Sequence, residues 1–71
     1  MPQPAIGVLL NGESRELPPN QSIADLLHSL SVPLDRVAIE LNKAIVRKRD
    51  WENTTIAPGS QIEIVEFVGG G

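Results

Sequence analysis

The feature that most constrains this fold is a single short helical segment at residues 22–30, SIADLLHSL. Four apolar side chains recur there at the helical spacing i, i+3, i+4 and i+7: Ile23, Leu26, Leu27 and Leu30. Ser22 is a typical N-cap, and Asp25 three residues later completes a capping box. A helix of about ten residues is marginal alone in water. We therefore expect it to end before Pro33 and to pack on a β-sheet.

The segment before this helix predicts a β-hairpin. Apolar residues alternate between positions 5 and 10, and Asn11-Gly12 follows, a pair that favours a two-residue hairpin turn. A weaker alternation over residues 13–17 stops at Pro18-Pro19, because proline cannot donate to a strand ladder. We predict strands at 5–10 and 13–17.

The segment after the helix predicts a second hairpin and a final strand. Residues 37–41 alternate, Asn42-Lys43 is a turn candidate, and 44–46 can form a short return strand. Residues 47–55 predict an irregular connector with one helical turn around 50–53. Pro58-Gly59 predicts a turn, and 61–68 predicts the longest strand.

This order of elements, β-β-α-β-β-connector-β, predicts an α+β roll of the β-grasp type. One helix should lie across a mixed sheet of four to five strands, with the last strand beside the first. Residues 1–71 show no repeat or linker, so we expect one domain.

Composition excludes several classes of function. The chain has no cysteine, which removes disulfides, thiolate metal sites and side-chain persulfides. Its net charge of −3 argues against nucleic acid. The apolar N-terminal run is too short for a signal peptide, and no stretch approaches the ~20 apolar residues of a membrane span. We expect a cytoplasmic protein.

Side chains suited to catalysis or to metal binding are few. His28 is the only histidine and lies on the polar flank of the predicted helix. The chain contains no phosphate-binding loop motif. We predict that it is not an enzyme and itself binds no metal or cofactor. The basic run Arg47-Lys48-Arg49 is either a solvated loop or a docking contact for an acidic partner, and Trp51 should cover one end of an aliphatic core.

The final strand predicts one buried and one outward face. Ile62 and Ile64 should point into the core, whereas Glu63, Val65 and Phe67 share the other face. Unless the connector or Trp51 covers them, these three outward residues form a candidate partner-docking surface.

Three glycines follow this strand: Gly69, Gly70 and Gly71. They are either a frayed terminus or a flexible reactive tail. Residues without Cβ can thread a narrow channel, and three extended residues reach about 10 Å. If Gly71 is the last residue, its α-carboxylate can carry cargo once a partner has activated it with ATP. The activated acyl group could then accept a lysine amine or sulfur.

Four stretches identify a family resemblance: LNG, SIADLL, VAIELNKAIVRKRDW and PGSQIEIVEFVGGG. With these the chain resembles the ThiS family, the sulfur carriers of bacterial thiamine biosynthesis, in the β-grasp (ubiquitin-like) superfamily. The family more often has glycine where Lys43 stands.

The resemblance implies a mechanism. A ThiF-like enzyme would adenylate the Gly71 carboxylate with ATP, and a cysteine desulfurase persulfide would convert it to a thiocarboxylate. A ThiG-like thiazole synthase would then receive the sulfur, with Gly69 and Gly70 threading into the partner. The alternatives are a carrier like the small subunit of molybdopterin synthase, or a non-covalent β-grasp binding module.

Overall fold

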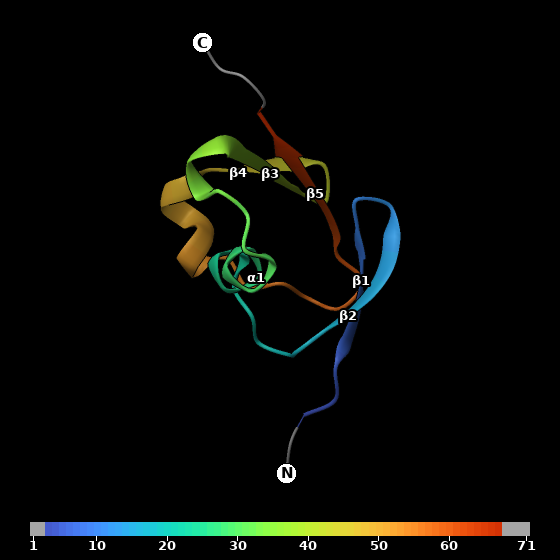
Figure 1. Ribbon diagram of the computed structural model, residues 1–71. Coiled ribbons are helices and arrows are strands. Elements are labelled where there is room, and N and C mark those ends of the chain that lie inside the picture. The colour runs from blue at the N-terminus through green and yellow to red at the C-terminus, as the bar shows by residue number, and fades with distance from the viewer. Residues whose placement is uncertain (1–2, 68–71) are drawn as a thin grey trace.

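The computed structural model describes residues 3–67 of the chain. In chain order its elements are β1 (Ile6–Leu10), β2 (Glu13–Leu17), α1 (Ile23–Leu30), η1 (Leu34–Arg36), β3 (Val37–Leu41), β4 (Ala44–Val46), η2 (Lys48–Asn53) and β5 (Gln61–Glu66), where η marks a 3₁₀-helix. The sheet curves around α1, which lies against one of its faces (Figure 1). This is the β-grasp arrangement that the sequence predicts.

The five strands form one mixed sheet in the order β2-β1-β5-β3-β4. β5 runs parallel to β1 and antiparallel to β3, so the chain's last strand lies between its two hairpins. The prediction that the last strand lies beside the first is therefore confirmed. Ile62 sits where both hairpins meet β5, because it is paired with Leu10 on one side and with Leu41 on the other.

Helix α1 begins with the predicted capping box. The Ser22 hydroxyl accepts a hydrogen bond from the Asp25 N–H at 3.0 Å, and the Asp25 carboxylate accepts one from the Ser22 N–H at 3.0 Å. The helix ends at Leu30, before Pro33, because Ser31 adopts the left-handed conformation with φ 57°. Of the four stripe residues, Ile23, Leu26 and Leu27 are buried, whereas Leu30, at the last helical position, is 38% exposed.

The core is aliphatic apart from Trp51, as the composition predicts. Its buried apolar residues are Val8, Leu10, Ile23, Leu26, Leu27, Val37, Ile39, Trp51, Ile56 and Ile62. The Trp51 side chain is buried in this core, and its indole N–H donates to the Val46 carbonyl at 2.9 Å. The helical turn expected near residue 50 is a longer 3₁₀-helix, η2, which packs against α1. The short helix η1 was not predicted.

Both predicted hairpin turns have two successive residues in the left-handed region. Asn11 and Gly12 have φ values of 50° and 82°, and Asn42 and Lys43 have values of 53° and 71°. A type I′ turn requires this geometry, and it matches the twist of the flanking strands. Glycine adopts it freely, whereas Lys43 carries a Cβ into a region that is unfavourable for it.

Candidate functional site

β5 leads directly to the terminal segment, and main-chain bonds hold it from both sides. On the β1 side, the Leu9 N–H donates to the Ser60 carbonyl at 2.9 Å. On the β3 side, pairing runs along the whole strand, from Leu41 opposite Ile62 to Val37 opposite Glu66. β5 is thus a central strand with neighbours on both edges.

The turn asparagines add side-chain bonds to β5. The Asn11 N–H donates to the Ile62 carbonyl at 2.8 Å, and the Asn11 side-chain oxygen accepts from the Ile64 N–H at 2.7 Å. Asn42 does the same on the other side: its N–H donates to the Gln61 carbonyl at 2.7 Å, and its side-chain oxygen accepts from the Gln61 N–H at 2.9 Å. The sequence identified both asparagines as turn residues only, so this role was missed.

Pairing continues beyond the last residue of β5. The Phe67 N–H donates to the Arg36 carbonyl at 2.7 Å, so the chain is still held beside the start of β3 at Phe67. The three predicted tail residues, Gly69, Gly70 and Gly71, lie outside the described residues.

The predicted outward face of β5 is confirmed as exposed. Val65 and Phe67 are 53% and 57% exposed, and Glu63 is exposed beside them. Neither the connector nor Trp51 covers them. Of the two residues predicted to face inward, Ile62 is buried and Ile64 is half-buried.

This open face also carries a cross-strand pair of like charges. Glu63 lies directly opposite Glu40 of β3, and Val65 lies opposite Ala38. A shallow hollow of about 400 Å³ adjoins them, lined by Glu40, Lys43, Gln61, Glu63 and Val65. Opposed carboxylates destabilise a sheet slightly. The face thus combines exposed apolar area with two carboxylates, and Lys43 lines the same hollow.

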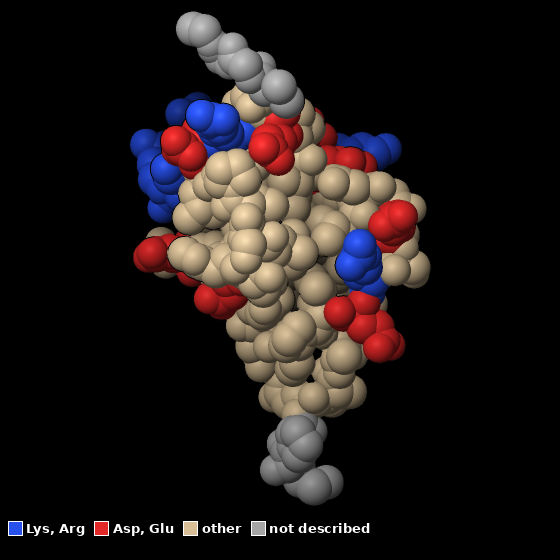
Figure 2. Space-filling model, in the orientation of Figure 1, with Lys and Arg blue, Asp and Glu red and all other residues tan. Residues whose placement is uncertain are grey.

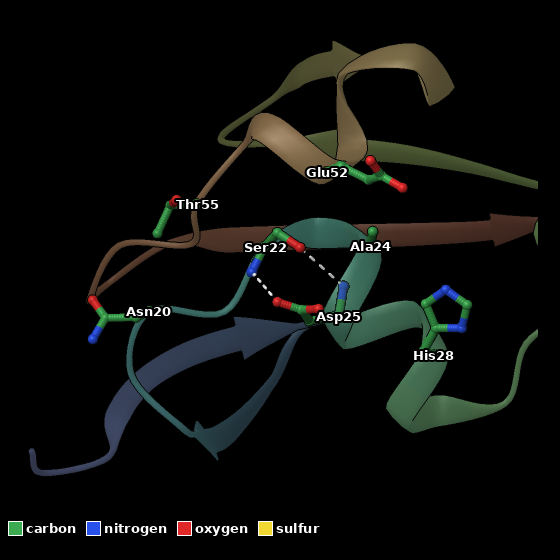
Figure 3. A pocket seen from close by; sticks show the side chains of 7 residues that line it. All are labelled: Asn20, Ser22, Ala24, Asp25, His28, Glu52 and Thr55. Atoms are coloured by element: carbon green, nitrogen blue, oxygen red, sulfur yellow. Dashed lines mark hydrogen bonds between the residues drawn. The ribbon is translucent and has the colours of Figure 1, made fainter. Parts of the chain in front are cut away.

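A second hollow, of about 420 Å³, surrounds the start of α1 (Figure 3). Ser22 and Asp25 face each other there, His28 lies one turn further along, and Glu52 reaches in from η2. Hydrogen bonds from the Ser22 backbone and side chain lower the pKa of Asp25. Because these bonds complete the capping box, Ser22 and Asp25 have a structural role, and no ion pair joins His28 to either carboxylate.

Residues 3–67 contain neither a metal-binding cluster nor a membrane-spanning helix. No group of three or more histidine, cysteine, aspartate or glutamate side chains among them could hold a metal ion. None of the helices in this part of the chain is long and apolar enough to cross a membrane. The basic run Arg47-Lys48-Arg49 is exposed where β4 leads into η2.

Comparison with known proteins identifies the family. Residues 8–71 match the model of the ThiS family. The thiazole synthase of Paramagnetospirillum magneticum is 36% identical over 64 residues, which cover 90% of this chain but 20% of that protein. The chain thus spans about one fifth of the length of this curated relative. The uncharacterized protein ycf40 of Porphyra purpurea is 33% identical over 66 residues, covering 93% of both chains.

A solved structure agrees with the sequence matches. The crystal structure of the thiamine biosynthesis protein ThiS from Geobacter metallireducens superposes with a TM-score of 0.82 at 26% identity, covering 93% of this chain and all of that one. Proteins of the ThiS family are sulfur carriers. On the extent of these matches, the chain belongs to the ThiS family.

Proposed function

We propose that this chain is a sulfur carrier of thiamine biosynthesis and that Gly71 bears the sulfur as a terminal thiocarboxylate. The match to the ThiS family carries this proposal, because it runs from residue 8 through Gly71 and includes the three glycines after the final strand. The fit to the solved ThiS structure supports the same role.

The chemistry requires partners at each step. A carboxylate is a poor electrophile, so an adenylating enzyme of the ThiF type first joins the Gly71 carboxylate to AMP, releasing pyrophosphate from ATP. The terminal sulfur of a cysteine desulfurase persulfide then attacks the acyl carbon and AMP leaves, forming an acyl disulfide. Two thiols, or one dithiol, then split the S–S bond by exchange and are oxidised to a disulfide, leaving the thiocarboxylate on Gly71 and a thiol on the desulfurase. ATP is held by the partner, since this chain has no phosphate-binding loop motif.

A thiazole synthase of the ThiG type is the proposed acceptor of the sulfur. Support comes from the curated relative, which is itself a thiazole synthase and matches this chain over one fifth of its length. That relative combines a thiazole synthase with a region similar to this chain. This combination favours a direct contact between this chain and a separate thiazole synthase. Gly69 and Gly70 would lead the thiocarboxylate into the acceptor's active site, since residues without Cβ fit a narrow channel.

The open face of β5 is the proposed docking surface for these partners: Glu63, Val65 and Phe67. Its support is exposure of two large apolar side chains beside a carboxylate, close to the point where the chain leaves the sheet. Apolar area would supply binding energy, and Glu63 with Glu40 would favour a partner that presents basic side chains.

Intact-mass measurement tests the carrier role. The chain is incubated with ATP, a ThiF-like enzyme, a cysteine desulfurase with cysteine, and a thiol. We expect the mass to rise by the difference between sulfur and oxygen, and only when ATP is present. A chain lacking Gly71 should gain nothing while retaining the same circular dichroism spectrum. No mass change with an enzyme set that is active on another carrier would exclude the carrier role.

The docking surface is tested by the substitution Phe67→Glu. It should slow adenylation of the chain, measured by pyrophosphate release, while the melting temperature stays unchanged because Phe67 is exposed. The control is Ser14→Glu, which adds the same charge to an exposed position of β2. Equal rates for both variants would reject this surface.

A further inference from the structure

The two edges of the sheet differ in how well they are protected. β2 forms one edge and carries three charged residues: Glu13, Arg15 and Glu16. β4 forms the other and is wholly apolar over Ala44–Val46. Ile45 is 74% exposed, the most of any large apolar side chain in residues 3–67. Exposed edges are usually protected by charge, by proline or by a short strand; β4 has only the last, with three residues.

The backbone of Ile45 is available for pairing with another strand. Arg36 and Asn42, at the two ends of β3, direct backbone groups towards β5. Backbone groups alternate in direction along a strand, so Ile39 and Leu41 direct theirs towards Val46 and Ala44 of β4. The N–H and C=O of Ile45, between these two, therefore point to the free edge.

An apolar groove adjoins this edge. β4 pairs with β3 only as far as Ile39, which leaves Val37 and Ala38 beyond its end. The resulting notch has a volume of about 320 Å³ and is lined mainly by apolar side chains, among them Val37, Ile45 and Trp51. Its wall is preformed, because the Trp51 indole is fixed by its hydrogen bond to the Val46 carbonyl.

The surroundings of the groove are basic in an otherwise acidic chain. Four of the six lysines and arginines belong to, or are next in sequence to, the residues that line the groove: Arg36, Arg47, Lys48 and Arg49. Arg47 and Lys48 line the groove itself together with Asp35. Figure 2 shows lysine and arginine side chains gathered on the side where η2 lies in Figure 1. Within residues 3–67, Arg49 is paired with Asp50 at 4.0 Å, and neither Arg47 nor Lys48 forms an ion pair.

We propose that the β4 edge and its groove bind an extended acidic segment of a partner protein. The segment adds a strand beside β4 through the N–H and C=O of Ile45, places an apolar side chain in the groove against Trp51, and sets carboxylates beside Arg47 and Lys48. Strand addition to a free edge is a common mode of peptide recognition, in which backbone bonds give affinity and side-chain pockets give specificity.

Charge argues for this occupant over a second copy of the chain. In two copies joined antiparallel through Ile45, Arg47 of each copy would lie opposite Lys43 of the other, which is unfavourable. The surface adjoins the docking face of β5, because Ile45 is paired with Glu40 and Glu40 with Glu63. The two surfaces differ in charge, since Arg47 and Lys48 line the groove. The inference does not depend on the sulfur-carrier role.

The test uses a synthetic probe, acetyl-Asp-Val-Ile-Val-Asp-Glu-amide, titrated into the ¹⁵N-labelled chain. We expect chemical-shift changes to centre on the amides of residues 45–48 and on the Trp51 indole N–H. The substitutions Ile45→Lys and Lys48→Glu should each weaken binding by about tenfold or more. Arg15→Glu on the opposite edge is the matched control and should leave binding unchanged.

Several outcomes would overturn the proposal. The first is shift changes on β2 or on the face of β5 in place of β4. The second is equal binding of a probe whose acidic residues are all replaced by lysine, and the third is no binding at millimolar probe. If the chain alone dimerises with rising concentration, and Ile45→Lys abolishes this, the edge belongs to a second copy. Thermal melts of each variant check that the fold is retained, which the exposure of Ile45 and Lys48 favours.

Discussion

The two hairpins that flank β5 have the same type of turn, but they differ in the extent of their pairing with β5 and in the second residue of the turn. Each has a two-residue turn that begins with asparagine, and each asparagine gives β5 one backbone and one side-chain hydrogen bond. The first hairpin pairs with β5 through only two residue pairs, whereas the second pairs through five. The first turn continues with Gly12 and the second with Lys43.

The comparison shows how a short sheet compensates for limited strand pairing. β1 ends at Leu10, opposite Ile62, so no β1 residue faces Ile64. The Asn11 side chain takes that place and satisfies the Ile64 N–H. On the β3 side, the Asn42 side chain bonds to Gln61, the first residue of β5, one position before the pairing with β3 begins at Ile62. The strand that leads to the terminal glycines is thereby held by turn side chains as well as by strands.

The largest effect should come from the residue that both hairpins share. Ile62→Ala removes a side chain that is 1% exposed and paired with both neighbours, so it should reduce the free energy of unfolding by about 2–5 kcal/mol. Urea denaturation measures this loss. The control Val65→Ala, on the exposed face of the same strand, should cost less than about 0.5 kcal/mol. Similar losses of stability at Ile62 and Val65 would contradict the assignment of Ile62 to the buried face of β5 and of Val65 to the exposed face.

Removing the asparagine side chains separates the two hairpins. Asn11→Gly and Asn42→Gly keep the left-handed turn but delete the acceptor, so each should cost about 0.5–1.5 kcal/mol. We expect the greater loss for Asn11, because Ile64 is half-buried and has no strand residue opposite on that side, whereas Gln61 is exposed. Urea denaturation and exchange of the Ile64 and Gln61 amides measure both effects.

The matched variants for this test are Asn11→Asp and Asn42→Asp. Both keep a side-chain acceptor near the same N–H, so near neutral pH they should lose less stability than the glycine variants. Equal losses for Asn11→Gly and Asn42→Gly would contradict the view that the first hairpin depends more on its turn.

These turns also show what the sequence could and could not predict. Both turns, both hairpins and the capping box follow from neighbouring residues, so local pattern was sufficient. The bonds from Asn11 to Ile64 and from Asn42 to Gln61 span 53 and 19 positions, and nothing local distinguishes an asparagine that bonds only its own turn. Leu30 shows the limit of local pattern: it has the spacing of the apolar stripe, but its side chain is exposed because α1 ends at this residue.

The site was predictable to a similar extent. Strand alternation gave the outward face of Glu63, Val65 and Phe67 correctly, because side chains alternate strictly along a strand. The groove beside β4 was not foreseen, since it arises from the unequal lengths of β3 and β4 and from the position of Trp51. The basic run was noticed in the sequence, but only the fold places it beside an apolar edge.

A smaller effect should follow from making the two turns identical. Lys43→Gly relieves a left-handed residue that carries a Cβ, and should stabilise the protein by about 0.5–1 kcal/mol after the greater freedom of glycine in the unfolded chain is counted. The reverse change in the first turn, Gly12→Lys, should destabilise by a similar amount, about 0.5–1 kcal/mol. Thermal and urea unfolding measure both. A destabilised Lys43→Gly would mean that the Lys43 side chain makes a contribution that outweighs its backbone conformation.

The smallest expected effect is the pH dependence of stability that comes from the Asp25 carboxylate, which caps α1. The side-chain oxygens of Asn11 and Asn42 should show no such dependence. The pKa of Asp25 is lowered by hydrogen bonds from the Ser22 backbone and hydroxyl, so its folded value lies below the 3.8 expected when unfolded. A depressed folded pKa stabilises the protein above the unfolded value, and this contribution is lost as the pH falls through the folded one. The difference in free energy of unfolding between the natural chain and Asp25→Asn should therefore shrink between about pH 6 and about pH 2.

The same comparison with Asn11→Gly provides the control. An amide oxygen does not titrate, so the difference between the natural chain and Asn11→Gly should stay constant over that range. Urea denaturation at both pH values measures the two differences, and subtracting the natural chain at each pH removes the effect of every other carboxylate. If the Asp25→Asn difference also stayed constant, the charge of the Asp25 carboxylate would add no stability. The capping box would then stabilise the helix through hydrogen-bond geometry alone, as the uncharged asparagine oxygens do.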